Sequence, residues 1–541
     1  MKVADSIRRE RRQDWRRLGS RAFDAVVVGG GISGASVYRE LCRRGFRTLL
    51  LERGDFACGT SQASAMMAWG GLLYLSHLDV SNVVRLSRAR ERLIRQEAGT
   101  VTPRTFRYLA GGGGRRPWVA GAALWLYWLM GGLRRQPPRR IGGDETPAFL
   151  KDEWRRGGFD YQEAVIRPSD ARFVAQCVLD KNHPGSSALN YCALRRGTFD
   201  RRQGLWKLRL ADRLLGCHRT VRCLKVVCAA GPWTDALNAR FKIQTPYRHV
   251  LSRGVFLGMP LEALGADARR DEDAFSPLIF DTGRDADIFG LIPWGPLALW
   301  GPTETVVDET RRGFQAGRQD VAFLLERLNR VLRRPVTAAD IVSLRCGVRP
   351  LALEAEAPTP ASTLRCSKRF HIHADSARPW ISVYGGKFTD AGLMACQVAD
   401  LALRSLACPS GRALPEPKRA AGMTGEPTRF GPRSPLQNLG IRARSPRSPT
   451  QWACFPGLEG DFPSARWCRQ HEKCYTLADY LRRRTNISQW TFRGGLGRND
   501  ENMGHLLELA SVFCDGNLRR ARQKVTRYRR EVDAGLRCLS P

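Results

Sequence analysis

A glycine-rich turn between two apolar segments carries the clearest chemical signal in the chain. Gly29, Gly31 and Gly34 have the spacing G-x-G-x-x-G after one apolar run, and Glu52 ends the next apolar run. This order is typical of a βαβ unit that binds a dinucleotide. Gly29 allows the tight turn, Gly31 lets a pyrophosphate approach the backbone, and Gly34 lets the helix pack close to the sheet. The helix N-terminus can bind the phosphates, and Glu52 can accept hydrogen bonds from the ribose hydroxyls.

The elements that must position these residues follow from the apolar pattern. Apolar runs that end at Gly or Pro predict strands, and apolar residues at helical spacing predict helices. We expect strands at 222–229 and 380–384, a hairpin formed by 288–294 and 297–300, an extended segment that passes into a helix over 159–180, and helices at 80–96, from 234, and at 389–406.

Length, charge and cysteine content narrow the class of protein. The 541 residues, 43% of them hydrophobic, can bury a large core in two or more domains. The net charge of +36 could serve an anionic membrane, a nucleic acid or an anionic substrate, or could be an Arg-rich bias without function. Because the Arg residues are spread along the chain, we expect no specific nucleic-acid partner. None of the 16 Cys falls in a C-x-x-C pair, which favours a reducing cytoplasm.

One apolar segment, 118–133, raises the question of membrane contact. It contains three Trp and one Tyr and is flanked by Arg pairs on both sides. A membrane span takes about 20 apolar residues, and this segment is shorter and contains three Gly. We therefore expect a helix that docks on the protein or lies in the membrane interface. The predicted location is cytoplasmic, peripheral on the inner face of the cytoplasmic membrane.

Further motifs lie at intervals along the chain. They are D-F-A-C-G-T-S at 55–61 with G-G-L-L-Y-L at 70–75, V-V-C-A-A-G-P-W at 226–233, C-G-V-R-P-L at 346–351, Y-G-G-K-F-T at 384–389, and T-L-A-D-Y-L-R-R-R-T at 476–485. In combination they resemble the FAD-dependent glycerol-3-phosphate dehydrogenase family, within the D-amino-acid-oxidase-like flavoprotein superfamily. The likeness spans most of 23–405 and part of 454–541.

The resemblance implies an α/β fold: a Rossmann-like FAD-binding domain, an interleaved substrate domain on an antiparallel sheet, and a small helical C-terminal domain. It implies oxidation of a secondary alcohol, in which hydride passes to flavin N5, a base takes the hydroxyl proton, and a quinone or other acceptor receives the electrons. The FAD-binding residues are expected to be Gly29, Gly30, Gly31, Ser33, Gly34, Glu52, Arg53, Thr60, Ser61, Gly70, Gly71, Ala230, Gly231, Gly386 and Lys387.

The resemblance assigns catalytic roles to Arg349, Lys387 and Thr389. Negative charge that develops on the flavin ring needs a fixed cation or N–H donors nearby, and an anionic substrate needs Arg or Lys. Arg349 lies between Val348 and Pro350 in an apolar run, which disfavours a plain surface position. Lys387 follows a Gly pair that permits close approach to a ligand.

Several positions depart from the family pattern. The family usually carries His or a cation at places where this chain has the apolar residues Met66, Trp69, Leu73 and Phe256. The leading substrate is sn-glycerol 3-phosphate or a related polyol phosphate, bound with help from Arg253 and Lys368. The alternatives are a flavoprotein of the same fold acting on a 2-hydroxy or amino acid, and a non-catalytic FAD-binding relative.

Composition divides the chain into parts. We expect a basic N-terminal extension at 1–22, the FAD-binding domain with its interleaved substrate domain at 23–407, a linker at 408–450 and the helical domain at 451–541. The substrate part is expected at about 238–340.

Two sets of side chains have a functional and a structural interpretation. His371 and His373 could act as bases, but a His in an alternating strand is more often structural. Cys454, Cys468, His471 and Cys474 could ligate zinc or an iron–sulfur cluster. Because these residues can simply share a helix face, we expect no metal.

Overall fold

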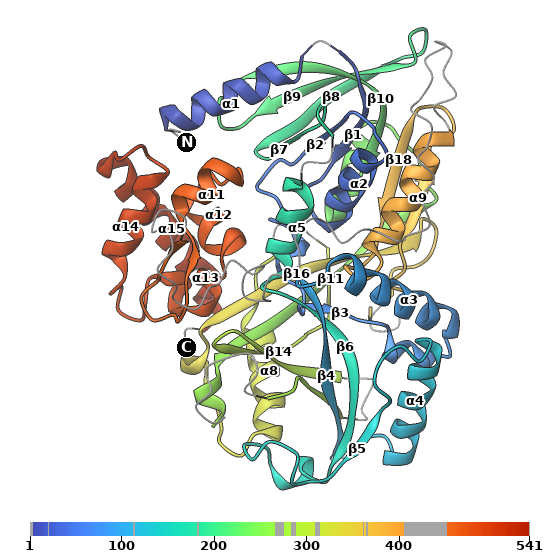
Figure 1. The fold of residues 1–541 in the computed structure, drawn as a ribbon, viewed down its shortest axis with the longest axis vertical. Coiled ribbons are helices and arrows are strands. Elements are labelled where there is room, and N and C mark those ends of the chain that lie inside the picture. Colours follow the sequence, from blue (N-terminus) through green and yellow to red (C-terminus); the bar gives the residue numbers. More distant parts are fainter. Residues whose placement is uncertain are drawn as a thin grey trace.

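The computed structural model shows two large sheets, covering helices and a helical C-terminal region (Figure 1). It describes residues 4–19, 21–111, 114–180, 183–265, 275–282, 288–308, 314–360, 362–363, 366–404 and 452–539. The predicted linker at 408–450 lies outside these ranges, as does the end of the predicted helix at 389–406.

The first sheet contains the predicted βαβ unit. Its strands are β1 (Phe23–Val28), β2 (Thr48–Leu51), β7 (Ser187–Leu189), β8 (Cys192–Asp200), β9 (Leu205–Asp212), β10 (His218–Cys228), β17 (His371–Ala374) and β18 (Trp380–Tyr384). The parallel core has the order β18–β10–β1–β2–β7. β17 pairs antiparallel with β18, and β9 and β8 extend β10 as an antiparallel ribbon.

Both faces of the parallel core are covered, which explains its continuous apolar strands. Helices α2 (Ile32–Arg43), α5 (Asp170–Leu179) and α9 (Ala391–Arg404) bury Val27 and Leu50 on one face. Val26 and Leu49 point to the other face, where they pack with residues of β9 and β10. This sandwich fixes the turn between β1 and α2, where the glycines lie.

The second sheet is mostly antiparallel. Its strands are β3 (Met67–Ala68), β4 (Val101–Ala110), β5 (Arg139–Ile141), β6 (Gly158–Ile166), β11 (Tyr247–Pro260), β12 (Leu278–Asp281), β13 (Ile288–Trp294), β14 (Leu297–Gly301), β15 (Thr305–Val307) and β16 (Ser343–Glu354). β13 and β14 form the predicted hairpin. β11 and β16 pair along their whole length and carry Arg253 and Arg349.

This sheet extends beyond the substrate part expected at about 238–340. Four of its strands, β3 to β6, come from 67–166, before the expected start. β4 gave little strand signal because Arg104 and Arg107 interrupt its apolar residues. In the sheet Arg107 pairs with Asp160 of β6, with Nε 2.9 Å from Oδ1.

Further helices cover the second sheet. They are α3 (Val80–Gln96), at the predicted position, α4 (Pro117–Met130) and α8 (Arg318–Val331), whereas α6 (Thr234–Arg240) packs against β10 and β18 of the first sheet. Figure 1 shows α3 and α4 on the same side of the molecule. Leu124 and Tyr127 on the inner face of α4 are buried, while Trp118, Trp125 and Leu129 are exposed.

The C-terminal region confirms the predicted helical domain. It contains β19 (Trp452–Ala453), β20 (Phe462–Pro463), α11 (Ala465–His471), α12 (Leu477–Asp479), α13 (Ile487–Trp490), α14 (Met503–Val512) and α15 (Leu518–Leu536). Its core shares one apolar cluster with Phe256, Ile292 and Leu299 of the second sheet. The domain therefore packs directly on the second sheet.

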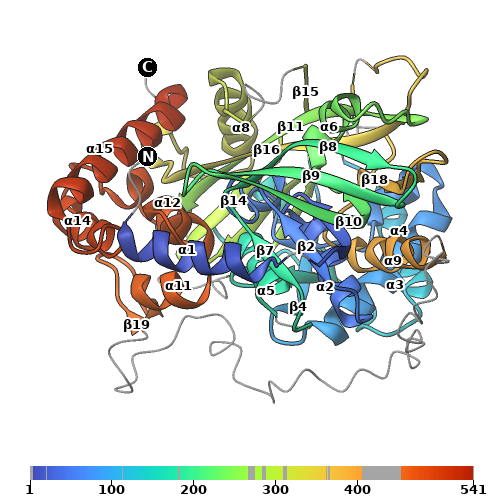
Figure 2. The ribbon, with the colours of Figure 1, turned by 90° about the horizontal axis from the view of Figure 1, so that it is seen from above.

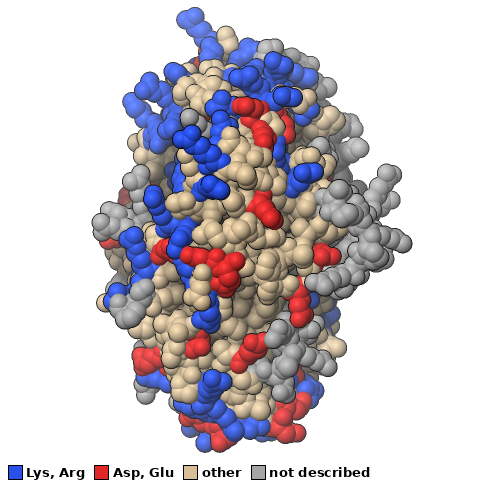
Figure 3. Space-filling view, turned by 90° about the vertical axis from the view of Figure 1, so that its left-hand side faces the viewer, with Lys and Arg blue, Asp and Glu red and all other residues tan. Residues whose placement is uncertain are grey.

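The basic N-terminal segment forms helix α1 (Asp5–Arg17), which Figure 2 shows lying across the molecule near the C-terminal helices. Arg11 is fully buried, and its Nε lies 2.5 Å from Asp212 Oδ2, which also accepts a hydrogen bond from Trp15. Asp14 pairs with Lys473 at 2.7 Å. On the face of the molecule that Figure 3 shows, Lys and Arg are scattered widely and gather most densely at its upper end.

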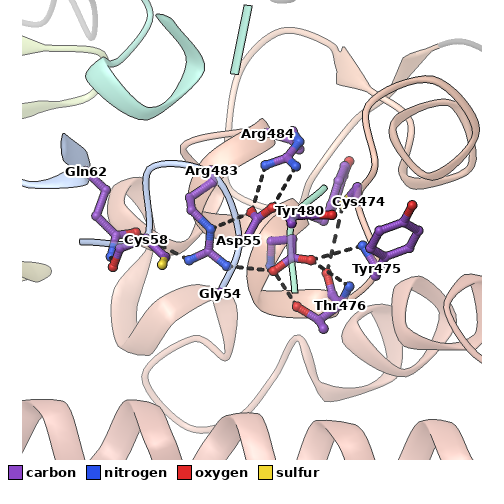
Figure 4. A network of polar contacts seen from close by, with 12 residues as sticks. Gly54, Asp55, Cys58, Gln62, Cys474, Tyr475, Thr476, Tyr480, Arg483 and Arg484 are labelled. Carbon is purple, nitrogen blue, oxygen red and sulfur yellow. Dashed lines mark hydrogen bonds and ion pairs between the residues drawn. The ribbon is translucent and has the colours of Figure 1, made fainter. Parts of the chain in front are cut away.

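A buried carboxylate joins the loop after β2 to the C-terminal domain (Figure 4). Asp55 accepts a hydrogen bond from Arg483 Nε at 2.7 Å and a bidentate pair from Arg484 at 2.9 and 3.0 Å. Asn190 donates a further bond at 2.8 Å. Burial alone raises the pKa of the Asp55 carboxyl, but the charges of Arg484 and Arg483 outweigh it and lower the pKa to about 2.

Replacing Asp55 by Asn removes the carboxylate that two buried guanidinium groups share, although Arg483 keeps its pair with Asp479 at 2.6 Å. We expect the free energy of unfolding at pH 7 to fall by about 3–5 kcal/mol, measured by denaturant titration. Asp533→Asn is the matched control, because that carboxylate pairs with Arg493 at 2.9 Å but is 45% exposed. The control should cost less than about 1 kcal/mol.

The stabilisation that Asp55 provides depends on pH, and the lowered pKa fixes the direction of this dependence. Because the folded-state pKa of Asp55 lies below its ordinary value of about 3.9, the stabilisation is complete above that value and is lost as the pH falls toward 2. The stability difference between wild type and Asp55→Asn should shrink over this window. A variant as stable as wild type at pH 7 contradicts the role given to Asp55.

Candidate functional site

One cavity of about 1130 Å³ extends from the glycine turn after β1 to the second sheet. Pockets for drug-sized ligands are about 300–1,000 Å³, so a dinucleotide and a small substrate can share this one. Most predicted site residues lie on its wall: Gly29, Gly31, Ser33, Glu52, Arg53, Thr60, Ser61, Ala230, Gly231, Arg253, Arg349, Lys368, Gly386, Lys387 and Thr389.

The glycine turn has the geometry that a phosphate cradle requires. Gly29 has φ +113°, and a Cβ on it would lie 2.3 Å from the Ala229 carbonyl oxygen. A Cβ on Gly34 would lie 1.8 Å from the Gly29 oxygen, so this glycine lets the helix pack on the turn. Gly31 faces the cavity at the N-terminus of α2, where the backbone N–H groups point at a ligand.

Glu52 lies where a ribose is expected to bind. Its Oε2 accepts a hydrogen bond from Gly30 N, and Oε1 accepts one from Gly54 N, each at 2.7 Å. Burial raises the pKa of this carboxyl, and the two N–H donors act against that rise. The backbone thus orients the carboxylate toward the cavity that it lines.

The loop after Glu52 connects the turn to the second sheet. Ser61 Oγ accepts a hydrogen bond from Ile32 N, in the first turn of α2, at 2.9 Å. Thr60 donates to the carbonyl of Val348, the residue before Arg349. Thr60 and Ser61, which are both predicted to bind FAD, therefore also position the loop against α2 and β16.

Four predicted FAD-binding glycines are not on the described cavity wall. Gly30 and Gly34 pack against the protein side of the turn: a Cβ on Gly30 would meet Glu52, and one on Gly34 would meet the Gly29 oxygen. Gly70 and Gly71 face away from the cavity: Gly70 N donates to Glu163 at 3.1 Å, and a Cβ on Gly70 would lie 2.1 Å from the Tyr127 hydroxyl. Gly70 and Gly71 thus pack against side chains of α3, of α4 and of Tyr74, and their direct contact with FAD stays a prediction.

Lys387 places a half-buried amine on the cavity wall. Its Nζ donates to the Tyr74 hydroxyl and lies 4.3 Å from the centre of that ring. Burial lowers the pKa of Lys387 to about 7, although the nearby Asp390 opposes the shift. Asp390 also accepts a hydrogen bond from Lys387 N at 2.9 Å and fixes the loop.

Arg349 reaches the cavity from β16. Its Nη1 donates to the Thr303 carbonyl at 3.3 Å. A Cβ on Gly254 of the paired strand would lie 2.3 Å from Nη2, so that glycine makes room for the guanidinium. With five N–H donors, this group has the capacity to bind an anion.

The predicted substrate cations are paired with carboxylates. Lys368 Nζ lies 3.2 Å from Glu304 Oε1, and Arg253 Nη2 lies 2.9 Å from Asp320 Oδ2. Both pairs line the cavity. Thr389 also lines it, and its hydroxyl donates to the Trp69 carbonyl at 3.0 Å.

The departures from the family pattern separate into two groups. Trp69, Leu73 and Phe256 line the cavity and make its substrate end more apolar. Met66 is buried outside the described cavity wall, and its sulfur accepts a hydrogen bond from Asp170 N at 3.3 Å.

Sequence reasoning did not single out Glu304, Asp390 or Tyr74. Glu304 lies in the short connection between β14 and β15. This position between two strands was the only sequence signal that could have indicated a role for it. Asp390 comes directly after the predicted Thr389. Tyr74 lies within the motif at 70–75, but its contact with Lys387 joins segments 313 residues apart.

The histidine and cysteine candidates have structural positions. His371 packs on Tyr247 with ring centres 4.6 Å apart. Cys468 and Cys474 belong to the core of the C-terminal domain, whereas Cys454 is exposed. Within the described part of the chain, no group of three or more His, Cys, Asp or Glu is arranged to hold a metal ion.

A family model and the sequences of known proteins both match this chain. Residues 24–389 match the DAO family, described as FAD dependent oxidoreductase. Glycerol-3-phosphate dehydrogenase of Mycobacterium leprae (strain TN) is 30% identical over 410 residues, which is 73% of this chain and 65% of that protein. Aerobic glycerol-3-phosphate dehydrogenase of Staphylococcus aureus (strain USA300) is 27% identical over 393 residues, 71% of this chain and 67% of that protein. The matched part thus spans about 65% of the mycobacterial relative's length.

Solved structures share the fold. Glycerol-3-phosphate dehydrogenase from Bacillus halodurans, complexed with FAD, has a TM-score of 0.67 at 20% identity, with 98% of both chains covered. L-α-glycerophosphate oxidase from Mycoplasma pneumoniae with FAD bound has a TM-score of 0.53 at 13% identity, covering 71% of this chain and 95% of that one.

The glycine turn generates a direct test of cofactor binding. Gly31→Val places a side chain on the cavity wall where the pyrophosphate is expected, so the variant should lose FAD. Gly392→Val is the control, because a Cβ there meets nothing within 4 Å on the exposed side of α9. The ratio of flavin to protein absorbance after reconstitution measures the effect. A Gly31→Val protein that retains one FAD per chain contradicts the assignment.

Proposed function

The chain belongs to the family of FAD-dependent oxidoreductases, and on that premise we propose that it oxidises the secondary alcohol of a small anionic substrate. The leading candidate is sn-glycerol 3-phosphate, or a related polyol phosphate. The observation that carries the proposal is that Arg349 and Lys387 line the same cavity as the glycine turn and Glu52.

The residues at the cofactor end fit FAD. The turn at Gly29–Gly31 leaves space that a Cβ would fill, α2 offers its N-terminal N–H groups, and Glu52 offers a carboxylate. When bound, FAD supplies the ring nitrogen N5 that accepts the hydride of the alcohol carbon. The residues of the chain hold this group, orient the substrate and stabilise charge.

Lys387 is the residue we assign to charge stabilisation. Its amine is held by the Tyr74 hydroxyl and by the loop that Asp390 fixes, and it carries a positive charge below its pKa of about 7. A preorganised cation in a cavity shielded from water stabilises developing negative charge without further reorganisation. Arg349 orients the substrate, because its guanidinium can donate two parallel hydrogen bonds to an anionic oxygen pair.

A second candidate acts on a 2-hydroxy or amino acid with the same fold. Trp69, Leu73 and Phe256 on the cavity wall favour it, because they replace polar groups expected near a phosphate. A non-catalytic FAD-binding relative is the third reading, and Lys387 with Arg349 in the cavity argue against it.

We also propose that a quinone is the electron acceptor and that the protein binds the membrane surface through α4. Trp118, Trp125 and Leu129 are 69%, 47% and 59% exposed on one side of this helix. Pairs of Arg flank it at 115–116 and 134–135. Exposed Trp and Leu between basic residues suit an interfacial helix. Among the described helices, none is long and apolar enough to cross a membrane.

Anaerobic mixing of the FAD-loaded protein with a panel of polyol phosphates, 2-hydroxy acids and amino acids tests the substrate class. We expect sn-glycerol 3-phosphate or a related polyol phosphate to bleach the flavin. Bleaching by 2-hydroxy or amino acids alone supports the second candidate. A flavin that none of these compounds bleaches contradicts the catalytic reading.

Variants test the roles of the two cations. Lys387→Met should slow flavin reduction by about 10²–10³, the usual loss for one preorganised group. Arg349→Ala should chiefly raise the substrate concentration needed for half-maximal reduction. Arg334→Ala, an exposed site away from the cavity, is the control. Wild-type rates and affinities in both cavity variants would show that the assignment is wrong.

Membrane attachment through α4 can be tested by sedimentation with anionic vesicles. Because exposed charge is screened within about 10 Å at 0.1 M ionic strength, salt should weaken binding. Trp125→Ser should weaken it further by removing an exposed ring. Binding that salt and Trp125→Ser leave unchanged contradicts this surface.

A further inference from the structure

Glu304 is a carboxylate among the cations at the substrate end of the cavity. Its Oε1 and Oε2 lie 3.2 and 3.3 Å from Lys368 Nζ. Thr363 Oγ1 donates to Oε1 at 3.2 Å. The Glu304 side chain is only 9% exposed. It is therefore a fixed negative charge on the cavity wall, unlike a solvated surface acid.

Arg349 is anchored to the same short stretch of backbone. It donates to the carbonyl of Thr303, the residue immediately before Glu304. Lys368 and Arg349 thus both contact the short segment that carries the carboxylate. Glu304 already supplies one negative charge to this pair of cations.

Lys387 also lines the cavity, but its pKa of about 7 leaves it only partly charged at neutral pH. Apart from Lys387, the rest of this end of the cavity adds little free positive charge for a substrate. Arg253 is paired with Asp320 at 2.9 Å. Trp69, Leu73 and Phe256 are uncharged. A ligand that binds Arg349 must therefore approach the Glu304 carboxylate, and the repulsion grows in proportion to the ligand's own charge.

We propose that Glu304 sets the charge of the substrate, so that the cavity binds a secondary alcohol with one negative charge more tightly than one with two. The inference rests on the proposed function and names the ionic class of its substrate. A phosphate monoester, with a second pKa of about 6, is mostly doubly charged at neutral pH. A polyol phosphate is therefore bound in its singly protonated form, while a 2-hydroxy acid already carries the single charge.

Two probes without an alcohol group test this by calorimetry on the FAD-loaded protein: sulfate with two charges and acetate with one. Glu304→Gln should bind sulfate about tenfold more tightly than wild type does. Because the gain scales with ligand charge, acetate should gain only about threefold. Glu326→Gln, on α8 with a side chain 56% exposed, is the control and should change neither affinity more than about twofold.

A second variant separates charge from shape. Glu304→Asp keeps the charge and should bind both probes within about twofold of wild type. If Glu304→Gln fails to hold FAD, Lys368→Met provides the test. It leaves Glu304 unopposed and should weaken sulfate binding more than acetate binding.

Three results overturn the proposal: unchanged or weaker sulfate binding in Glu304→Gln, equal gains for both probes, or a tenfold gain in Glu304→Asp. In the Lys368→Met arm, equal losses for the two probes overturn it. These outcomes do not depend on turnover. A panel that fails to bleach the flavin therefore counts against the proposed function and leaves the result for Glu304 to be judged separately.

Discussion

The buried Asp55 carboxylate fixes the loop on which the rest of the site depends. Arg483 and Arg484 hold it from the C-terminal domain, so residues far apart in sequence secure the segment that follows β2. At one end of this loop Glu52 faces the cofactor end of the cavity. At the other end Ser61 binds the first turn of α2, and Thr60 binds the backbone beside Arg349. The ion pairs of Asp55 therefore align the glycine turn, the Glu52 carboxylate and strand β16, which carries Arg349.

Most buried charged side chains in this protein are paired with opposite charges, and this pattern shows which cations remain for a ligand. Arg345 in the interior lies 2.7 Å from Asp170, and Arg11 lies 2.5 Å from Asp212. Such pairs are costly to break, since removing one partner leaves a buried charge. Within the cavity Lys387 is held by a neutral Tyr74 hydroxyl, and Arg349 by a backbone carbonyl. Among the described residues neither cation forms a direct ion pair with a carboxylate, although the Glu304 charge acts on Arg349 from nearby. Both groups therefore keep N–H donors for a ligand, which is why these two residues carry the proposed function.

Local sequence predicted the parts of the fold that short-range physics determines. The turn at Gly29–Gly34, helix α3 and the β13–β14 hairpin each have a signal within about 20 residues, and each is present. In the N-terminal part of the second sheet the extended segment predicted from residue 159 is β6, whereas β4 was missed because it carries Arg within its apolar pattern. The motifs around Asp55 and Arg484 were both recognised, but their contact spans 429 residues and has no local signal. Glu304 was missed for the same reason, because its proposed role depends on an ion pair with Lys368, which lies on a distant segment.

We propose above all that the cavity holds FAD along the glycine turn, with its reactive ring beside Lys387 and Arg349. A crystal structure of the FAD-loaded protein tests this most directly. We expect the pyrophosphate at Gly29–Gly31, the ribose hydroxyls on Glu52, and the flavin ring within contact of Lys387. Density that places the pyrophosphate away from the N-terminus of α2, or the ring at a site that neither Lys387 nor Arg349 touches, would contradict it.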